Sequence, residues 1–117
     1  MVCDDDKDIV TTLTMGLKRP GFEVHGFNDP ALALQHIEDG CEGCHVMVTD
    51  FRMPNMNGFQ LVRRVREVRP DLKVVMMTAF EVSKPEFETV FPSMMAEGVL
   101  RKPFSISRLI EIIKEMK

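Results

Sequence analysis

The sequence predicts an α/β domain with a parallel sheet covered by helices on both faces. Short, almost wholly apolar segments alternate along the chain with longer segments whose apolar residues recur at helical spacing. This alternation gives the element order βαβαβαβαβα, and strands that are apolar on both faces are typical of a buried parallel sheet. Because crossovers between such strands are right-handed, we expect a doubly wound domain of three layers.

The first half of the chain carries the signatures of two helices and two strands. Apolar residues at positions 9, 10, 13 and 17 predict a helix over residues 7–19, and Gly21 ends it. Residues 22–27 alternate between apolar and polar side chains, which is typical of a strand. Asp29 and Pro30 provide an N-cap and a first-turn proline for a helix that runs to about residue 39. Residues 45–49 predict a short buried strand.

The second half continues the alternation. Asn57 and Gln60 have the spacing of a capping box, and the apolar residues that follow them predict a helix. Residues 73–78 predict another buried strand, and residues 99–101 predict a brief one. Ser105 is expected to cap the last helix, because apolar residues at positions 106, 109, 110 and 113 lie on one helical face.

Composition and charge exclude several classes of protein. The 117 residues suit a single domain, and contents of 44% hydrophobic and 28% charged residues are ordinary for a globular protein. The formal net charge of −3 gives no general attraction to nucleic acid or anionic lipid. The apolar runs are too short to span a membrane, and the N-terminus lacks the features of a signal peptide. We therefore expect a soluble, cytoplasmic protein.

Polar residues follow the predicted strands at their carboxyl ends, where doubly wound domains place their sites. These residues are Asp4, Asp5 and Asp6, then Asp50, then Thr78 and finally Lys102. Carboxylates this close repel one another unless a cation joins them, and oxygen ligands suit Mg²⁺. Lys102 and Thr78 add a positive charge and a hydrogen-bond donor for an oxyanion. A nucleophilic carboxylate beside a metal ion, with a lysine opposite, is suited to forming an acyl phosphate. We therefore expect phosphoryl transfer to an aspartate.

Four motifs follow one another with regular gaps. They are Asp4-Asp5-Asp6, Asp50-Phe-Arg-Met-Pro-Asn-Met-Asn-Gly58, Met-Thr78-Ala and Arg-Lys102-Pro-Phe. Together they resemble the receiver domain of two-component response regulators, and the resemblance extends over the whole chain. It implies one receiver domain over residues 1–117, with a flavodoxin-like fold and a five-stranded parallel sheet in the order 2-1-3-4-5.

The resemblance also implies a metal site. Asp50 corresponds to the phosphoacceptor at the end of the third strand. Asp4 and Asp5 correspond to the acidic pair that binds Mg²⁺, and Asp5 is favoured as the direct ligand. The backbone carbonyl of Arg52 would be a further ligand. Asp6 lies next to this pair, but an acidic residue at that position more simply begins the first helix.

Three further positions are implied to act on the phosphoryl group. Thr78 would bond a phosphoryl oxygen and report phosphorylation by moving inward. Ala79 would add a backbone N–H, and Lys102 would neutralise the charge of the phosphoryl group. The Lys102–Pro103 peptide bond is expected to be cis, which only an X–Pro bond adopts at moderate cost.

A protein of this kind is expected to be a switch rather than an enzyme. It would take its phosphoryl group from the phosphohistidine of a sensor histidine kinase or phosphotransferase, and it would lose that group slowly. The last two helices and the last strand would then bind an unknown output protein or a second copy in a homodimer. The basic helix after Asn57 is interrupted by Glu67 and lacks a groove-reading motif, so no direct contact with nucleic acid is expected.

The sequence departs from the family pattern in three places. Only three residues precede Asp4, so the first strand is expected to be truncated. Val99 occupies the position three residues before the conserved lysine, where the family usually has an aromatic residue. Residues 83–97 begin with a capping-box pattern but carry Pro92, which should shorten the expected helix and alter the signalling face.

Two other identities compete with the receiver. A haloacid dehalogenase-like phosphatase also uses a strand-end aspartate, Mg²⁺, threonine and lysine, but it needs a second aspartate where this chain has Arg52. The chain could instead be a receiver cut from a longer protein with a DNA-binding or kinase domain.

The third alternative is a redox or metal protein built on Cys41-Glu-Gly-Cys44-His45. This run matches the pattern of haem attachment and also offers dithiol or metal ligands, with His36 as a fourth ligand. A disulfide framework is not expected, and the simplest interpretation is an incidental pair of loop cysteines. The run precedes the third strand, which places it about 16 Å from Asp50, at the opposite end of the sheet.

Overall fold

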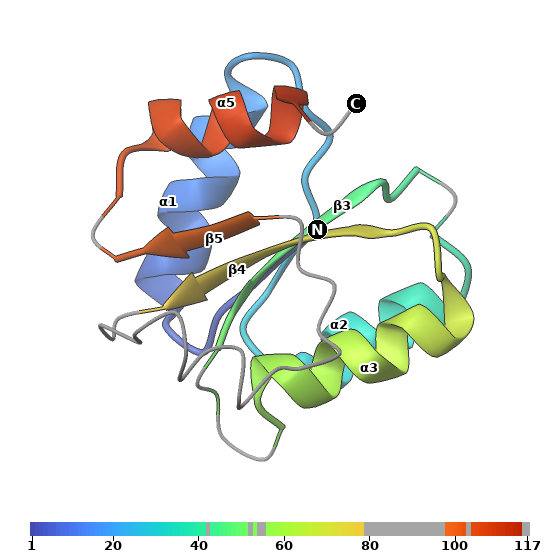
Figure 1. Cartoon of the computed structure of the whole chain (residues 1–117). Helices are drawn as coiled ribbons and strands as arrows, with labels where there is room; N and C mark the ends of the chain where they lie inside the picture. The colour runs from blue at the N-terminus through green and yellow to red at the C-terminus, as the bar shows by residue number, and fades with distance from the viewer. Residues whose placement is uncertain (42, 52, 54–55, 79–97, 103, 116–117) are drawn as a thin grey trace.

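The computed structural model of the chain describes residues 1–41, 43–51, 53, 56–78, 98–102 and 104–115 (Figure 1). Five parallel strands form one sheet in the order β2-β1-β3-β4-β5, which confirms the predicted order. The strands are β1 Val2–Cys3, β2 Gly26–Phe27, β3 Val46–Asp50, β4 Lys73–Thr78 and β5 Gly98–Arg101. The helix expected to begin at Ser83 lies outside the described residues.

In the described part of the chain, two helices cover each face of the sheet. Figure 1 shows α1 and α5 on one face and α2 and α3 on the other. Their bounds are α1 Lys7–Lys18, α2 Pro30–Glu38, α3 Gly58–Val68 and α5 Ile106–Glu115. Wherever the sequence predicted a helix boundary, the observed boundary lies within about one residue of it. This difference is within the ordinary uncertainty of helix boundaries. None of the helices in the described part of the chain is long and apolar enough to cross a membrane.

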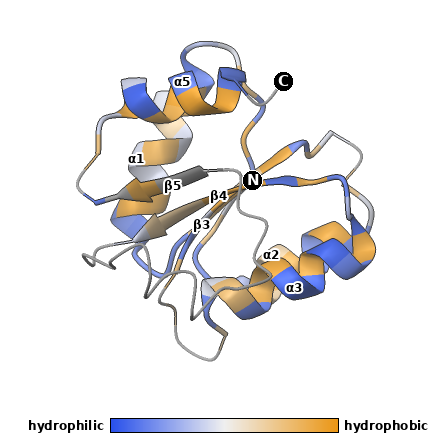
Figure 2. Cartoon of the chain, in the orientation of Figure 1, coloured by the Kyte–Doolittle hydropathy of each residue, from blue (hydrophilic) through white to orange (hydrophobic). Residues whose placement is uncertain are grey.

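The core consists of two apolar layers, one on each face of the sheet. Along β4, Val74 and Met76 pack with α2 and α3, whereas Val75 and Met77 pack with α1 and α5. This alternation follows from the two-residue period of a strand. Figure 2 shows the matching hydrophobic band of α5 on its side toward the sheet.

Side chains at the helix starts account for the helix boundaries. The Asp6 carboxylate accepts the Asp8 N–H at 2.9 Å, so Asp6 is the N-cap of α1, as expected for an acidic residue at a helix start. Asp29 caps α2 in the same way, and Ser105 accepts a backbone N–H from the first turn of α5. The Asn57 and Gln60 side chains form the predicted capping box of α3, at 2.8 and 3.0 Å.

The second strand is shorter than predicted. A strand was expected over residues 22–27, but only Gly26 and Phe27 belong to β2. The cause lies in the neighbouring strand, because β1 pairs with β2 only through Val2 and Cys3. An alternating sequence pattern does not make a strand where its partner offers no residues to pair with.

Cys41 and Cys44 form a disulfide, with Cα atoms 5.5 Å apart. The interpretation of these residues as an incidental loop pair was therefore wrong, although one bond of this short span is not a disulfide framework. The third cysteine, Cys3, is free and buried in the core. The disulfide lies in the loop between α2 and β3, at the opposite end of β3 from Asp50.

Candidate functional site

The polar residues predicted at the carboxyl ends of the strands lie together. Asp4 follows β1, Asp50 and Thr78 are the last residues of β3 and β4, and Lys102 follows β5. Asp4, Asp50 and Thr78 are buried, and the Lys102 side chain is 18% exposed. Because all strands are parallel and adjacent, their carboxyl ends meet at one edge, and this brings the four residues together.

The Lys102 ammonium group joins the two buried carboxylates. Its Nζ lies 2.7 Å from Asp4 Oδ2 and 3.2 Å from Asp50 Oδ1. The backbone N–H of Lys102 donates to the Thr78 carbonyl at 2.7 Å. This bond extends the β4–β5 pairing by one residue and fixes the backbone of Lys102 beside the end of β4. Lys102 therefore supplies the positive charge that these carboxylates need when no metal is bound.

Three carboxylates form a cluster that suits a hard cation. Each of Asp4, Asp5 and Asp50 has a carboxylate oxygen within 4.8 Å of a carboxylate oxygen of the other two. Asp5 is exposed, whereas Asp4 and Asp50 are buried, so the cluster combines fixed ligands with access to water. Mg²⁺ prefers a few carboxylate oxygens and several retained waters, and this donor set fits it.

Burial sets the protonation equilibria of the site. It raises the pKa of Asp50 above its ordinary value, and the neighbouring Asp4 carboxylate adds to that effect while Lys102 opposes it. Burial likewise raises the pKa of Asp4, against the hydrogen bond from Lys102. For Lys102, burial alone would lower the pKa, but the hydrogen bond and charge of Asp4 together with the charge of Asp50 raise it.

These shifts predict how Asp50→Asn changes stability with pH. A carboxyl group with a raised pKa in the folded state contributes stability below its unfolded pKa of about 3.9, and this stability is lost as the pH rises through the folded pKa. The amide of the variant does not titrate, so the free energy of unfolding of the variant, relative to the native chain, should increase with pH above about 4. Urea unfolding followed by far-UV circular dichroism in metal-free buffer measures this difference. A difference that is constant or shrinks with rising pH would contradict the prediction.

Gly58 is a site residue that the sequence analysis treated only as part of a motif. Its N–H donates to the Phe51 carbonyl at 2.7 Å, which closes the loop after β3 onto the start of α3. A Cβ at this position would lie 2.5 Å from the Asp50 carbonyl oxygen and 3.0 Å from Phe51 Cα. The backbone beside Asp50 is therefore so close to α3 that only glycine fits without a shift.

Several predicted features lie outside the described residues. They are the Arg52 carbonyl, the Ala79 N–H and the Lys102–Pro103 peptide bond. Val99 belongs to β5, but its side chain is also outside the described part of the chain. The predicted site residues that the structure does describe are thus Asp4, Asp5, Asp50, Thr78 and Lys102.

Comparisons with known proteins agree on one family. The family model described as "Response regulator receiver domain" matches residues 1–114 of this chain. The response regulator receiver protein CpdR of Brucella abortus (strain 2308) is 31% identical over 116 residues, which are 99% of this chain and 93% of CpdR. The DNA-binding transcriptional regulator NtrC of Azospirillum brasilense is 32% identical over 114 residues. That match covers 97% of this chain but 23% of NtrC.

Solved structures give the same result for the fold. The chemotaxis protein CheY4 of Vibrio cholerae is similar with a TM-score of 0.86 and 26% identity, over 99% of this chain and 95% of CheY4. A CheY-like receiver domain protein from Methanospirillum hungatei JF-1 also has a TM-score of 0.86, over 97% of this chain and 88% of its own. This chain therefore spans most of CpdR and CheY4, but less than a quarter of NtrC.

Proposed function

Because this chain belongs to the response regulator receiver family, we propose that Asp50 accepts and stores the phosphoryl group. The family is one of phosphoacceptor switches in two-component signalling, so the question for this chain is which residues carry that role. The observation that carries the assignment is the position of Asp50. Its buried carboxylate ends β3 and lies 3.2 Å from the Lys102 ammonium group. No other aspartate in the described part of the chain is at once the last residue of a strand, buried and beside a cation.

The proposed reaction is transfer from a phosphohistidine. An Asp50 carboxylate oxygen forms a bond to phosphorus as the phosphorus–nitrogen bond of the donor breaks, and the donor imidazole leaves. Burial raises the pKa of Asp50, and the Lys102 ammonium group 3.2 Å away opposes this shift and so favours the ionised carboxylate that the transfer requires. The donor is a sensor histidine kinase or a phosphotransferase, which is the partner class that the family implies.

Mg²⁺ is the proposed cofactor. Asp4, Asp5 and Asp50 would hold it, and the Arg52 carbonyl stays a predicted fourth ligand. When bound, the ion supplies positive charge to the phosphoryl oxygens in the transition state and product. Because the ion would neutralise Asp4, the Lys102 ammonium group becomes available to pair with a phosphoryl oxygen instead.

The acyl phosphate would change the surface through β4 and β5. A backbone hydrogen bond joins Thr78 and Lys102. A phosphoryl group that binds both side chains would therefore shift the ends of both strands. The Ala79 N–H stays a predicted contact of the phosphoryl group. We propose that β5 and α5, together with the helix predicted to begin at Ser83, form the surface that binds an output protein or a second copy. A cytoplasmic location and an activity limited to self-phosphorylation and slow hydrolysis belong to the same proposal.

Intact mass measurement after incubation with acetyl phosphate and Mg²⁺ tests this function. The native chain is expected to gain one phosphoryl group, only when Mg²⁺ is present, and to lose it to hydroxylamine, which cleaves acyl phosphates. Asp50→Asn should gain none, because an amide is not a nucleophile of this kind.

The matched control is Asp39→Asn, which changes an exposed aspartate at the end of α2. This variant should be phosphorylated like the native chain. A hydroxylamine-sensitive adduct that persists in Asp50→Asn would disprove the assignment of Asp50. The absence of any adduct on a folded native chain that binds Mg²⁺ would contradict phosphoacceptance itself.

A further inference from the structure

Four side chains that are common metal ligands gather at the amino end of the sheet, away from Asp50. His25 directly precedes β2, and His36 lies on α2. Cys41 and Cys44 lie in the loop between α2 and β3 and are joined by the disulfide. The sequence indicated His45 and His36 as possible ligands beside the cysteines. It did not indicate His25, because 15 residues, including the whole of α2, separate it from Cys41.

The ligand atoms are close to the spacing of a zinc site. Ligand atoms of His25, His36 and Cys41 lie within 4.8 Å of one another, and Cys44 Sγ lies 3.7 Å from His36 Nε2. Tetrahedral Zn²⁺ with two sulfur and two nitrogen ligands places neighbouring ligand atoms roughly 3.3–3.8 Å apart. The His25 and His36 rings have centroids 4.7 Å apart, and Phe27 packs against His36 at 5.2 Å. The two imidazoles are thus held together before any ion binds.

We propose that reduction of the Cys41–Cys44 disulfide creates a Zn²⁺ site formed by Cys41, Cys44, His25 and His36. The proposal commits to Zn²⁺ because two thiolates and two imidazoles are a common ligand set of tetrahedral zinc sites, and a C-x-x-C spacing is typical of them. Oxidised and metal-bound forms exclude each other, since a sulfur in the disulfide is not a thiolate ligand. The site is therefore both a metal site and a redox-dependent one.

The loop that carries both cysteines is held in place by contacts other than the disulfide. The Arg69 guanidinium group donates to the Cys41 carbonyl at 2.6 Å and to the Cys44 carbonyl at 2.9 Å. Asp71 contacts the same guanidinium group at 3.2 and 3.3 Å and so fixes its orientation. These bonds do not involve the sulfur atoms, so reduction of the disulfide removes neither the donors nor the acceptors. The two sulfurs then need only separate, while their Cα atoms stay near 5.5 Å apart.

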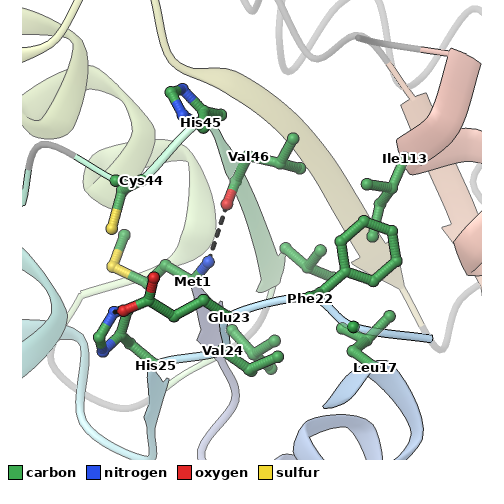
Figure 3. A pocket seen from close by; sticks show the side chains of 14 residues that line it. Met1, Leu17, Phe22, Glu23, Val24, His25, Cys44, His45, Val46 and Ile113 are labelled. Atoms are coloured by element: carbon green, nitrogen blue, oxygen red, sulfur yellow. Dashed lines mark hydrogen bonds and ion pairs between the residues drawn. The ribbon is translucent and has the colours of Figure 1, made fainter. Parts of the chain in front are cut away.

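The proposed site is open to an incoming ion. The His25 side chain is 37% exposed, and both His25 and Cys44 line a cavity of about 330 Å³. Figure 3 shows the Cys44 sulfur and the His25 ring toward the same end of this pocket, whereas the His45 ring points away from that sulfur. Glu23 contacts His25 Nε2 at 3.5 Å, which leaves Nδ1 as the nitrogen available for the metal.

The chemistry balances with a dithiol as the reductant. The dithiol gives two electrons and two protons to the disulfide, so that the protein gains two thiols and the reductant becomes a disulfide. Binding of Zn²⁺ then releases one proton from each thiol, and both imidazoles bind in the neutral form. Oxidation by a disulfide or a peroxide reverses the first step and expels the ion.

Cobalt titration of the full chain tests the proposal, because Co²⁺ reports thiolate ligands by absorption. The chain is reduced with a phosphine, freed of the reductant without oxygen and titrated with Co²⁺ in excess Mg²⁺, which occupies the carboxylate cluster. We expect one Co²⁺ per chain, with sulfur-to-cobalt charge-transfer and tetrahedral ligand-field bands that one equivalent of Zn²⁺ removes. The oxidised chain should show neither band.

Variants separate the proposed ligands from their neighbours. Replacing an outer-shell partner commonly weakens metal binding 10–100-fold, so loss of a direct ligand in His36→Gln or His25→Gln should weaken it by at least about tenfold. His45→Gln is the matched control, since it removes the exposed histidine next to Cys44 and should leave binding unchanged. Far-UV circular dichroism establishes that each variant is folded. His25→Gln remains informative if His36→Gln does not fold, because His25 lies outside the helices, directly before β2.

The result that overturns the proposal is equally specific. It is a folded, reduced native chain that shows no charge-transfer band, or bands whose strength is unchanged in both His25→Gln and His36→Gln. The outcome is independent of the phosphoacceptor assignment, because the assay reads sulfur ligands at the amino end of the sheet and needs no phosphoryl donor.

Discussion

Lys102→Met is expected to lower the free energy of unfolding of the metal-free chain by about 2–4 kcal/mol at neutral pH. The variant keeps an unbranched side chain, one atom shorter, but leaves Asp4 and Asp50 without the ammonium group that lies 2.7 and 3.2 Å from them. Removing one partner of a buried ion pair costs much more than losing a surface pair, because a charge stays buried without compensation. The lower part of the range reflects the 18% exposure of the lysine side chain.

The loss should depend on pH and on Mg²⁺ in a defined way. It should shrink at acidic pH, where Asp4 and Asp50 take up protons, and it should also shrink when Mg²⁺ supplies the missing positive charge. Urea unfolding followed by circular dichroism measures these effects, since the chain has no Trp or Tyr for fluorescence. Lys114→Met, at an exposed position of α5, is the control and should change stability by no more than about 0.5 kcal/mol. Equal losses in the two variants would contradict the role of Lys102.

Gly58→Ala is the second substitution with a large expected effect, a loss of about 1–3 kcal/mol of stability together with slower phosphorylation. The added methyl group would lie 2.5 Å from the Asp50 carbonyl oxygen, and that oxygen belongs to the backbone of β3, so it does not move aside easily. Alanine favours a helix over glycine by about 1 kcal/mol, but this gain is smaller than the cost of the overlap. Because the clash is with Asp50 itself, the displaced residue is the proposed phosphoacceptor.

Gly43→Ala provides the control for Gly58→Ala. Among the described residues, a Cβ on Gly43 would meet only Glu23, at 3.9 Å, so this change is expected to be nearly neutral for stability and for phosphorylation. Urea unfolding and the acetyl phosphate mass assay on both variants check the prediction. A stable Gly58→Ala variant that is phosphorylated at the native rate would show that the loop after β3 accommodates the methyl group without moving Asp50.

Features of the fold that depend on neighbouring residues could be predicted from the sequence. Residues 73–78 form β4 as expected, because a short apolar run between polar segments can be buried only as a strand here. The caps at Asp29 and Asn57 were predictable for the same reason, since a cap needs only a side-chain oxygen and the next few N–H groups. The convergence of Asp4, Asp50 and Lys102 followed from the parallel order alone.

Features that depend on how individual side chains and strand ends pack against distant segments could not be predicted. The alternation over residues 22–27 gave no sign that β1 would pair with only two of these residues. The close contact at Gly58 results from how α3 packs against the end of β3, and the motif showed only that a glycine is present. His25 lies beside His36 because β2 and α2 pack together, and no sequence spacing encodes that contact.

Strand β3 connects the two ends of the molecule. From Cys44 to Asp50 the chain advances six positions, which is about 20 Å in an extended strand. Asp50 cannot contact the cysteine loop across this distance, so a signal between the two ends would travel as a displacement along β3. Because β3 is paired on both sides, by β1 and β4, such a displacement would involve three strands moving together.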